Sequence, residues 1–230
     1  LSPNSYSTPA VISMIIYGLI MVAMFVTTFI TILYRFHKNL LADEGYLMHT
    51  LPVPVWQHIL SKLLVSILWI VASGAVAMVS IMILGFEISD FTGIYAFFAD
   101  TYQRAFAEIG FTLYVLSFEV ILGFFLSVAY GILIIYAAMA IGHMFNRHKI
   151  LASFGAFLVL NTISQLLFVL FVWMPSWLSS IEALQAFYMQ LSRELLLQLL
   201  IAYYLAFTTL VGAAYFALTN FILSKRLNLE

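Results

Sequence analysis

The chain contains no cysteine among its 230 residues. This absence excludes disulfide bonds, thiolate nucleophiles and metal sites built on cysteine ligands. Charged residues are also scarce, at 8% of the chain, whereas soluble domains contain about 25%. Because the formal net charge is only −1, the sequence gives no electrostatic reason to expect a nucleic-acid partner.

Sequence motifs of common catalytic sites are missing as well. The chain has no glycine-rich lysine loop for ATP phosphates, no Gly-x-Ser-x-Gly and no His-Glu-x-x-His. Paired acids within the apolar segments, which an intramembrane protease could use, are also lacking. We therefore expect a non-catalytic chain that holds no cofactor or metal of its own.

Long apolar runs account for most of the chain, which is 64% hydrophobic. Runs of about 18 or more apolar residues are typical of membrane-spanning helices. Five such runs occur, at residues 10–34, 63–86, 111–141, 150–173 and 195–223. The sequence therefore predicts an all-α, polytopic transmembrane helical bundle, with a single transmembrane domain covering residues 1–230 and five spans in contact with the lipid bilayer.

Basic residues gather on one side of these five spans. This side carries Arg35, Lys38, Lys62, Arg147, Lys149, Lys225 and Arg226. The other side has Arg104 and Arg193 among six acidic residues. Since lysine and arginine concentrate in cytoplasmic loops, we expect a multi-pass protein of the plasma membrane with a cytoplasmic C-terminus. Five spans would then place Leu1 outside, so we expect one further span before it and six in the complete protein.

The polar stretch at residues 35–62 separates the first two spans. Pro52 and Pro54 are expected to end one short helix and open another, because proline is tolerated in a first helical turn. A solvated loop that only sets topology would explain the basic residues. However, Tyr46, Leu47 and Met48 are apolar enough to require a protein surface or the membrane interface.

Residues 43–64, DEGYLMHTLPVPVWQHILSKLL, resemble the first cytoplasmic loop of permease subunits of type-2 ABC exporters, in the variety common in Gram-positive bacteria. Residues 140–154 and 224–230 are similar to that family too. The resemblance implies six spans, a second permease subunit and separate ABC ATPase subunits that bind ATP and Mg²⁺. It also implies a coupling helix near residues 39–51, with these ATPase contacts: Asp43, Glu44, Tyr46, Leu47 and Met48.

Polar and small residues in the third span suggest other sites. Glu119 is a candidate for a substrate pathway or gate, since carboxylates in membrane segments are often functional; a structural role near the outer boundary is the alternative. Gly123, Ser127 and Gly131 recur every four residues, a spacing that permits close helix packing; a dimer interface in the translocation pathway is the alternative. His143 and His148 lie in a basic turn with too few ligands for a metal site.

Two outer segments are also expected to touch the membrane. Residues 87–110 form a predicted loop whose six aromatic residues suit the headgroup zone. A short helix is predicted at residues 180–190, after a capping box that begins at Ser179.

These observations favour the membrane-spanning subunit of an ATP-driven ABC export complex. A stand-alone intramembrane enzyme and a membrane scaffold or sensor subunit are the alternatives. The nearly uncharged spans suit a hydrophobic or amphipathic substrate, and leave open its identity and whether the permease pair is a homodimer or a heterodimer.

Overall fold

The computed structural model describes residues 8–41, 53–85, 88–145, 147–178 and 191–225. Five of its helices are long and apolar enough to cross a membrane. Their spans are Val11–Leu41, Val55–Leu84, Thr112–Gly142, Lys149–Met174 and Glu194–Lys225. The chain is thus a multi-pass membrane protein of all-α fold, and the prediction of five spans in a helical bundle is confirmed.

Seven helical elements follow one another along the described chain. In order they are α1 (Thr8–Phe36), the π-helical turn η1 (His37–Leu41), α3 (Val55–Gly85), α4 (Ile88–Ile109), α5 (Thr112–Gly142), α6 (Lys149–Leu178) and α8 (Arg193–Lys225).

Local sequence signals explain where several helices begin. The α3 helix starts directly after Pro54, whose carbonyl oxygen accepts a hydrogen bond from the Gln57 amide. Gly110 joins α4 to α5 with a φ of 54°, a left-handed conformation that glycine adopts without steric cost. At the start of α8, the Ser192 hydroxyl accepts a hydrogen bond from the Leu195 amide, as an N-cap serine does.

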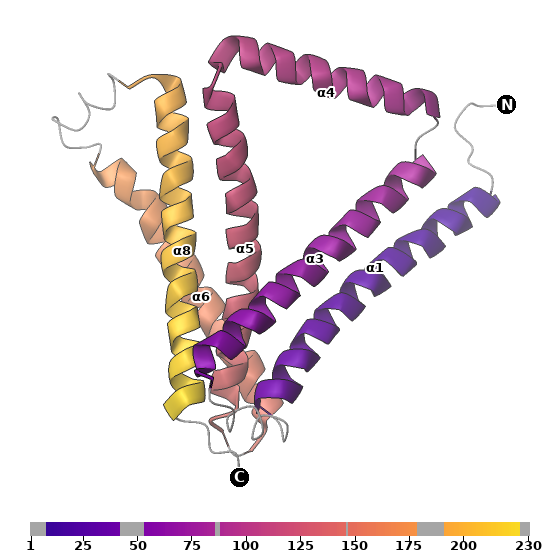
Figure 1. Cartoon of the computed structure of the whole chain (residues 1–230). Coiled ribbons are helices and arrows are strands. Elements are labelled where there is room, and N and C mark those ends of the chain that lie inside the picture. Colours follow the sequence, from indigo (N-terminus) through magenta and orange to yellow (C-terminus); the bar gives the residue numbers. More distant parts are fainter. Residues whose placement is uncertain (1–7, 42–52, 86–87, 146, 179–190, 226–230) are drawn as a thin grey trace.

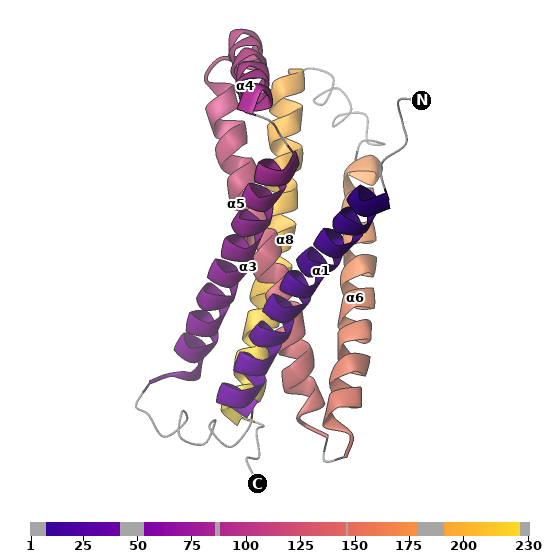
Figure 2. The same ribbon diagram turned by 90° about the vertical axis from the view of Figure 1, so that its right-hand side faces the viewer.

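The spans converge at one end of the bundle and separate toward the other (Figure 1). We call the convergent end the basic end, because Arg35, Lys149 and Lys225 lie at helix termini there and Lys62 lies in the second turn of α3. The opposite end, which carries Asp100, Glu108 and Glu194, is the acidic end. The α5 helix packs along both α6 and α8, while α1 and α3 run side by side and lean away from them (Figures 1 and 2).

Hydroxyl groups join α1 to α3 inside this leaning pair. The Tyr17 hydroxyl donates a hydrogen bond to the Ser80 Oγ at 2.9 Å. Lower in the pair, the Thr28 and Ser73 hydroxyls lie 2.9 Å apart. Interhelical hydrogen bonds of this kind help membrane helices to associate, since lipid supplies no hydrophobic driving force between them.

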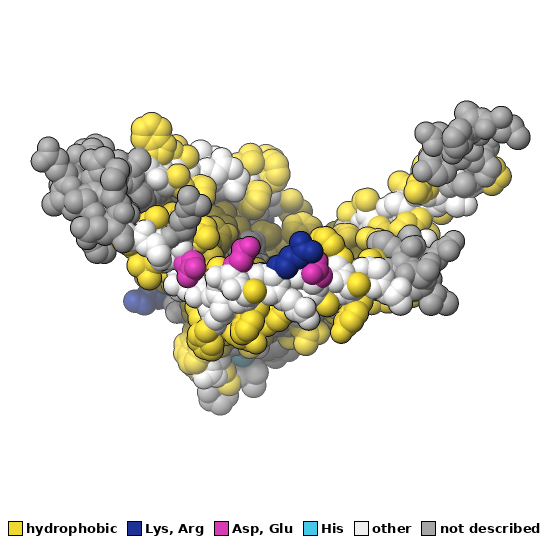
Figure 3. All heavy atoms as spheres, turned by 90° about the horizontal axis from the view of Figure 1, so that it is seen from above, with side chains coloured by type: hydrophobic (Ala, Val, Ile, Leu, Met, Phe, Trp, Pro, Cys, Tyr) yellow, Lys and Arg dark blue, Asp and Glu magenta, His cyan; other side chains and the backbone are white. Residues whose placement is uncertain are grey.

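The segment predicted as an outer loop at residues 87–110 is largely helical. The α4 helix crosses the acidic end from the top of α3 to the top of α5 (Figure 1). Four of its exposed aromatic side chains recur every three or four residues and share one face: Tyr95, Phe98, Tyr102 and Phe106. A fifth, Phe97, is exposed on the opposite face. The opposite face carries Asp100, Arg104 and Glu108, and Figure 3 shows charged side chains gathered along this helix above a hydrophobic flank. The prediction of a loop was therefore wrong, because amphipathic periodicity, and not mean polarity, decides the structure here.

One other boundary differs from the sequence interpretation. Residues 55–62 were expected in a separate short helix, yet they belong to the continuous helix α3. The predicted helix at residues 180–190 lies outside the described residues.

Candidate functional site

The predicted ATPase contacts Asp43, Glu44, Tyr46, Leu47 and Met48 all fall in residues 42–52, outside the described part of the chain. The two flanks of this segment are described, however. Immediately before it, Leu40 and Leu41 of η1 are buried. Shortly after it, Ile59 on the second turn of α3 is fully buried. Both flanks therefore end in the same hydrophobic cluster at the basic end.

Tyr136 of α5 is the polar centre of that cluster. Its ring stacks on Phe36 of α1, with the ring centroids 3.8 Å apart and the planes inclined by 13°. Its hydroxyl lies 2.9 Å from the Ser66 Oγ of α3. Only 1% of the Tyr136 surface is exposed. Three helices that are distant in sequence are thus joined through one side chain.

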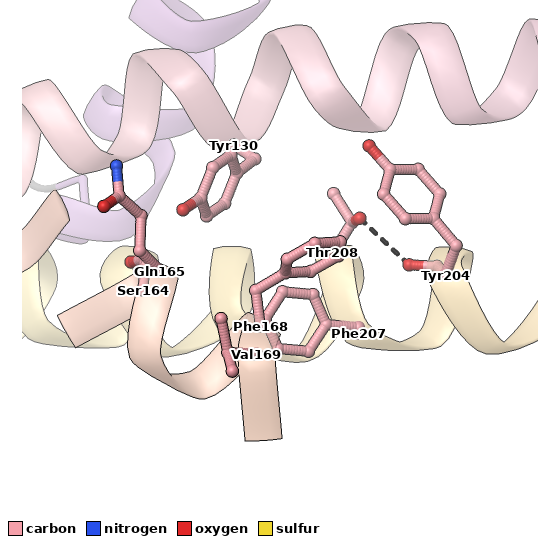
Figure 4. Close-up of a pocket in the computed structure, with 8 residues that line it drawn as sticks. All are labelled: Tyr130, Ser164, Gln165, Phe168, Val169, Tyr204, Phe207 and Thr208. Atoms are coloured by element: carbon pink, nitrogen blue, oxygen red, sulfur yellow. Dashed lines mark hydrogen bonds between the residues drawn. The ribbon is translucent and has the colours of Figure 1, made fainter. Parts of the chain in front are cut away.

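A second feature is a cavity of about 480 Å³ between α5, α6 and α8 (Figure 4). Aromatic and aliphatic groups form much of its wall, with hydroxyl and amide groups among them. Its lining comprises Tyr130, Ser164, Gln165, Phe168, Val169, Tyr204, Phe207 and Thr208. Cavities of this size and composition bind small, mostly apolar ligands that also carry a few polar groups.

Several of the cavity hydroxyls already have protein partners. The Ser164 hydroxyl bonds with the Tyr215 hydroxyl, and the Tyr204 hydroxyl lies 3.0 Å from the Ser127 Oγ. Figure 4 shows the Tyr130 hydroxyl and the Gln165 amide on the same side of the cavity. Both groups could form hydrogen bonds with a ligand in the cavity.

Glu119 lies in the upper part of α5, on the seventh residue after Thr112, and is partly buried. Its Oε2 atom is buried and has no hydrogen-bond partner among the described residues. Glu119 does not line the cavity between α5, α6 and α8. The structure therefore separates this carboxyl group from the polar groups of the cavity.

Gly123 and Ser127 lie where α5 meets α8. A Cβ atom on Gly123 would come within 3.2 Å of the Leu205 side chain, and Ser127 contacts Tyr204 as described above. Gly131 differs, because a Cβ atom there would have no neighbour within 4 Å. The closest helix approach involves a glycine that sequence reasoning missed: at Gly142, a Cβ atom would lie 2.6 Å from the Cα of Ser153 in α6.

The histidines of the basic end form no metal site within the described ranges, where no group of three potential ligands occurs. His37 and His143 do contact each other, with ring centroids 4.9 Å apart. The His143 Nδ1 lies 3.0 Å from the Met139 carbonyl oxygen. Because a carbonyl oxygen only accepts hydrogen bonds, Nδ1 must carry the proton in the neutral ring.

The cavity residues were missed in the sequence because each belongs to an apolar run. Gln165 is the signal that could have found them, since an uncharged amide in a membrane segment needs a polar partner. Tyr130 and Thr208 give no comparable signal, because tyrosine and threonine are common in such helices.

Comparisons with protein-family models, curated proteins and solved structures give no match for this chain.

Proposed function

We propose that this chain is the membrane-spanning subunit of an ATP-driven ABC export complex, which moves a hydrophobic or amphipathic substrate with energy from a separate ATPase subunit. The observation that carries the proposal is the burial of residues on both sides of residues 42–52. Leu40 and Leu41 before this segment, and Ile59 after it, are buried in the cluster that contains Tyr136. The resemblance of residues 43–64 to a coupling loop supports the same function.

Force applied to residues 42–52 would pass into the helices on either side. Leu40 and Leu41 before this segment are buried, as is Ile59 after the exposed residues 53–54, and packed interiors transmit strain because they have little free volume. The hydrogen bonds between α1 and α3 favour movement of this pair as one unit relative to α5, α6 and α8. The ATPase can drive this movement only if its contacts with the chain differ between the nucleotide states of the ATPase.

The lining of the cavity between α5, α6 and α8 supports the proposal of an uncharged or amphipathic substrate. Its aromatic wall offers dispersion contacts, and Tyr130 and Gln165 offer hydrogen bonds. No acidic or basic side chain lines it, so a fully charged small ion would lose its hydration there without compensation.

A second permease subunit fits the large apolar surface of the leaning pair. Val11–Leu41 and Val55–Leu84 each have 6% of the most apolar window buried within the chain, against 33% for Thr112–Gly142. Lipid would cover such surfaces in a monomer, and a partner subunit would cover part of them in a pair.

The decisive experiment is co-purification from native membranes in mild detergent, with partners identified by mass. We expect an ABC ATPase with the unmodified protein and its loss with Leu47→Asp or Met48→Asp, because a buried charge without a partner disrupts an apolar contact. Met144→Asp is the matched control, since Met144 is exposed at the same end but lies outside the loop. If no nucleotide-binding protein is recovered under any condition, a stand-alone enzyme or a scaffold becomes the better interpretation.

The orientation that this function requires can be tested separately. The cysteine-free background allows a single cysteine at His148, beside Arg147 and Lys149 at the basic end. An impermeant reagent added to intact cells should leave this cysteine unmodified. Rapid modification from outside would place the basic end and the C-terminus on the wrong side for an intracellular ATPase.

A further inference from the structure

Two side-chain amides lie near the middle of α6, in a span without charged residues after Lys149. Asn161 is near the centre of the span Lys149–Met174, and Gln165 follows one turn later. Residues four apart share one face of a helix. Gln165 is exposed and Asn161 is only partly buried, so both amides are open to a molecule beside this face of α6.

The described part of the chain leaves both amides unpaired. The hydroxyls of Ser153, Thr162 and Ser164 each donate to a carbonyl oxygen of their own helix at 2.9 Å, but neither Asn161 nor Gln165 has a hydrogen-bond partner among the described residues. An unpaired amide is costly in the middle of a membrane, where water cannot satisfy it. The two amides therefore require polar partners from outside the described chain.

Gln165 lines the cavity between α5, α6 and α8, where Figure 4 shows its amide on the same side as the Tyr130 hydroxyl. Phe168 and Phe207 supply part of the apolar wall, with ring centroids 5.6 Å apart. Asn161 lies one turn nearer the basic end and is not part of the cavity lining. A ligand that reaches both amides must therefore be elongated and run along α6 from the cavity toward the basic end.

The α5 helix leaves room at the height of Gln165. The helices α5 and α6 approach closely at Gly142 and Ser153, and Gly131 and Ser164 are equally far along the two helices from that point. Toward the acidic end the two helices separate (Figures 1 and 2). A Cβ atom on Gly131 would have no neighbour within 4 Å. The wall of α5 therefore has free space beside Gly131.

The spacing of the two amides matches that of a peptide backbone. Four residues of helix rise by about 6 Å. In an extended peptide, the peptide groups that face one edge recur at every second residue, which is about 6.7 Å. Each side-chain amide can donate to a peptide carbonyl oxygen and accept from a peptide N–H. The hydrocarbon chains of lipid can do neither.

We propose that the two α6 amides bind the backbone of an extended hydrophobic peptide, the substrate class of the proposed export complex. Gln165 pairs with one peptide group inside the cavity, and Asn161 pairs with a peptide group two residues along the ligand. The aromatic wall packs against apolar side chains of the peptide. The role of the peptide as substrate rests on the proposed export function, whereas its binding requires no ATPase.

A peptide and its ester analogue test the proposal. The full chain in phosphatidylcholine nanodiscs is exposed to a blocked tetrapeptide of alternating phenylalanine and leucine that carries a diazirine on one side chain. The matched probe has oxygen in place of the two central backbone N–H groups. Partition into lipid alone favours the ester, because it has fewer N–H groups to desolvate. We expect the peptide nevertheless to label α5, α6 and α8 at least about fivefold more, the factor for one hydrogen bond of ordinary strength.

Leucine variants assign this preference to the amides. We expect Gln165→Leu to lower the ratio of the two probes, and the double change Asn161→Leu, Gln165→Leu to bring them to equal labelling. Gln198→Leu in α8 is the matched control and should leave the ratio intact, because Gln198 does not line the cavity. Equal labelling of the unmodified protein by both probes would overturn the proposal, as would a preference that persists in the double variant.

Loss of the peptide site and loss of the export function give different results. A peptide preference without any co-purified ATPase would keep the peptide site and remove its transport role. An ATPase that co-purifies with a protein lacking the preference would keep the export function with another substrate class. The exposed Leu166, next to Gln165, tests the competing partner. Rapid disulfide formation between two copies through a cysteine at Leu166, in place of peptide labelling, would show that a second chain pairs with the amides.

Discussion

The ring of Tyr136 lies flat against the ring of Phe36, with 3.8 Å between the ring centroids. The Tyr136 hydroxyl is at the same time 2.9 Å from the Ser66 Oγ. These two contacts join α5 to α1 and to α3 at the one end where the spans converge (Figure 1). Because the same helices separate toward the acidic end, the Phe36–Tyr136 contact is the place about which α1 and α3 could rotate.

Removal of the Tyr136 contacts should therefore weaken the basic end. We expect Tyr136→Phe to lower the free energy of unfolding by about 0.6 kcal/mol, the average for interhelical hydrogen bonds in membranes. Tyr136→Leu should cost about 1 kcal/mol more, because it also removes the aromatic stacking. Thermal unfolding in nanodiscs measures both losses of stability. Tyr95→Phe is the control, because Tyr95 is exposed. A stability of Tyr136→Leu equal to that of the unmodified protein would contradict the central role of this residue.

The close approach of α5 to α6 should depend on Gly142. A Cβ atom there would lie 2.6 Å from the Cα and 2.5 Å from the backbone nitrogen of Ser153, so Gly142→Ala must displace one helix backbone. We expect a loss of at least about 2 kcal/mol, within the range for overpacking. Gly131→Ala in the same helix is the matched control, since its Cβ meets no neighbour. It should be neutral, or more stable by about 0.5 kcal/mol from the lower flexibility of the unfolded chain. Equal effects of the two changes would show that α5 and α6 do not approach at Gly142.

The two faces of α4 should meet different surroundings. The aromatic face with Phe98 is expected to enter the headgroup and acyl boundary, as apolar faces of in-plane amphipathic helices do, whereas Arg104 lies on the charged face. Single cysteines at Phe98 and at Arg104 can be introduced into the cysteine-free chain. We expect a water-soluble maleimide to modify the cysteine at Arg104 several times faster. Similar rates at both positions would place the whole helix in water.

Acid should destabilise the basic end through His143. Burial lowers the pKa of its imidazole below the ordinary 6.5, and repulsion from His37 and Lys149 acts in the same direction, although the hydrogen bond to the Met139 carbonyl opposes them. The unfolded chain therefore binds a proton at His143 more readily than the folded protein does. The contribution of neutral His143 is complete above pH 6.5 and is lost as the pH falls through the folded pKa.

The corresponding measurement is the midpoint of thermal unfolding in phosphatidylcholine nanodiscs at about pH 7.5 and about pH 5.5, on either side of the usual histidine pKa. We expect the unmodified protein to lose more stability on acidification than His143→Asn does. An identical pH dependence of the two proteins would show that His143 does not carry the effect.

Much of the fold was predictable because side-chain hydropathy is a local property. The five spans were found from the apolar runs alone, within a few residues of helices such as α5 and α6. The α4 helix was missed although its signal was present, since Tyr95, Phe98, Tyr102 and Phe106 recur with the period of a helix. The error came from judging residues 87–110 by their polarity and not by their periodicity.

The candidate sites depend on contacts between residues far apart in the chain. The sequence by itself determined the number of spans, the separation of basic from acidic ends and the apolar character of residues 46–48. The tertiary structure decided that Tyr136 meets both Phe36 and Ser66, that Gly142 and not Gly131 is the tight glycine of α5, and that His37 faces His143. The physical reason is that each helix enters the membrane because of its own hydrophobicity, which the sequence shows. Which helices then pack against one another depends on side-chain packing and hydrogen bonds between them.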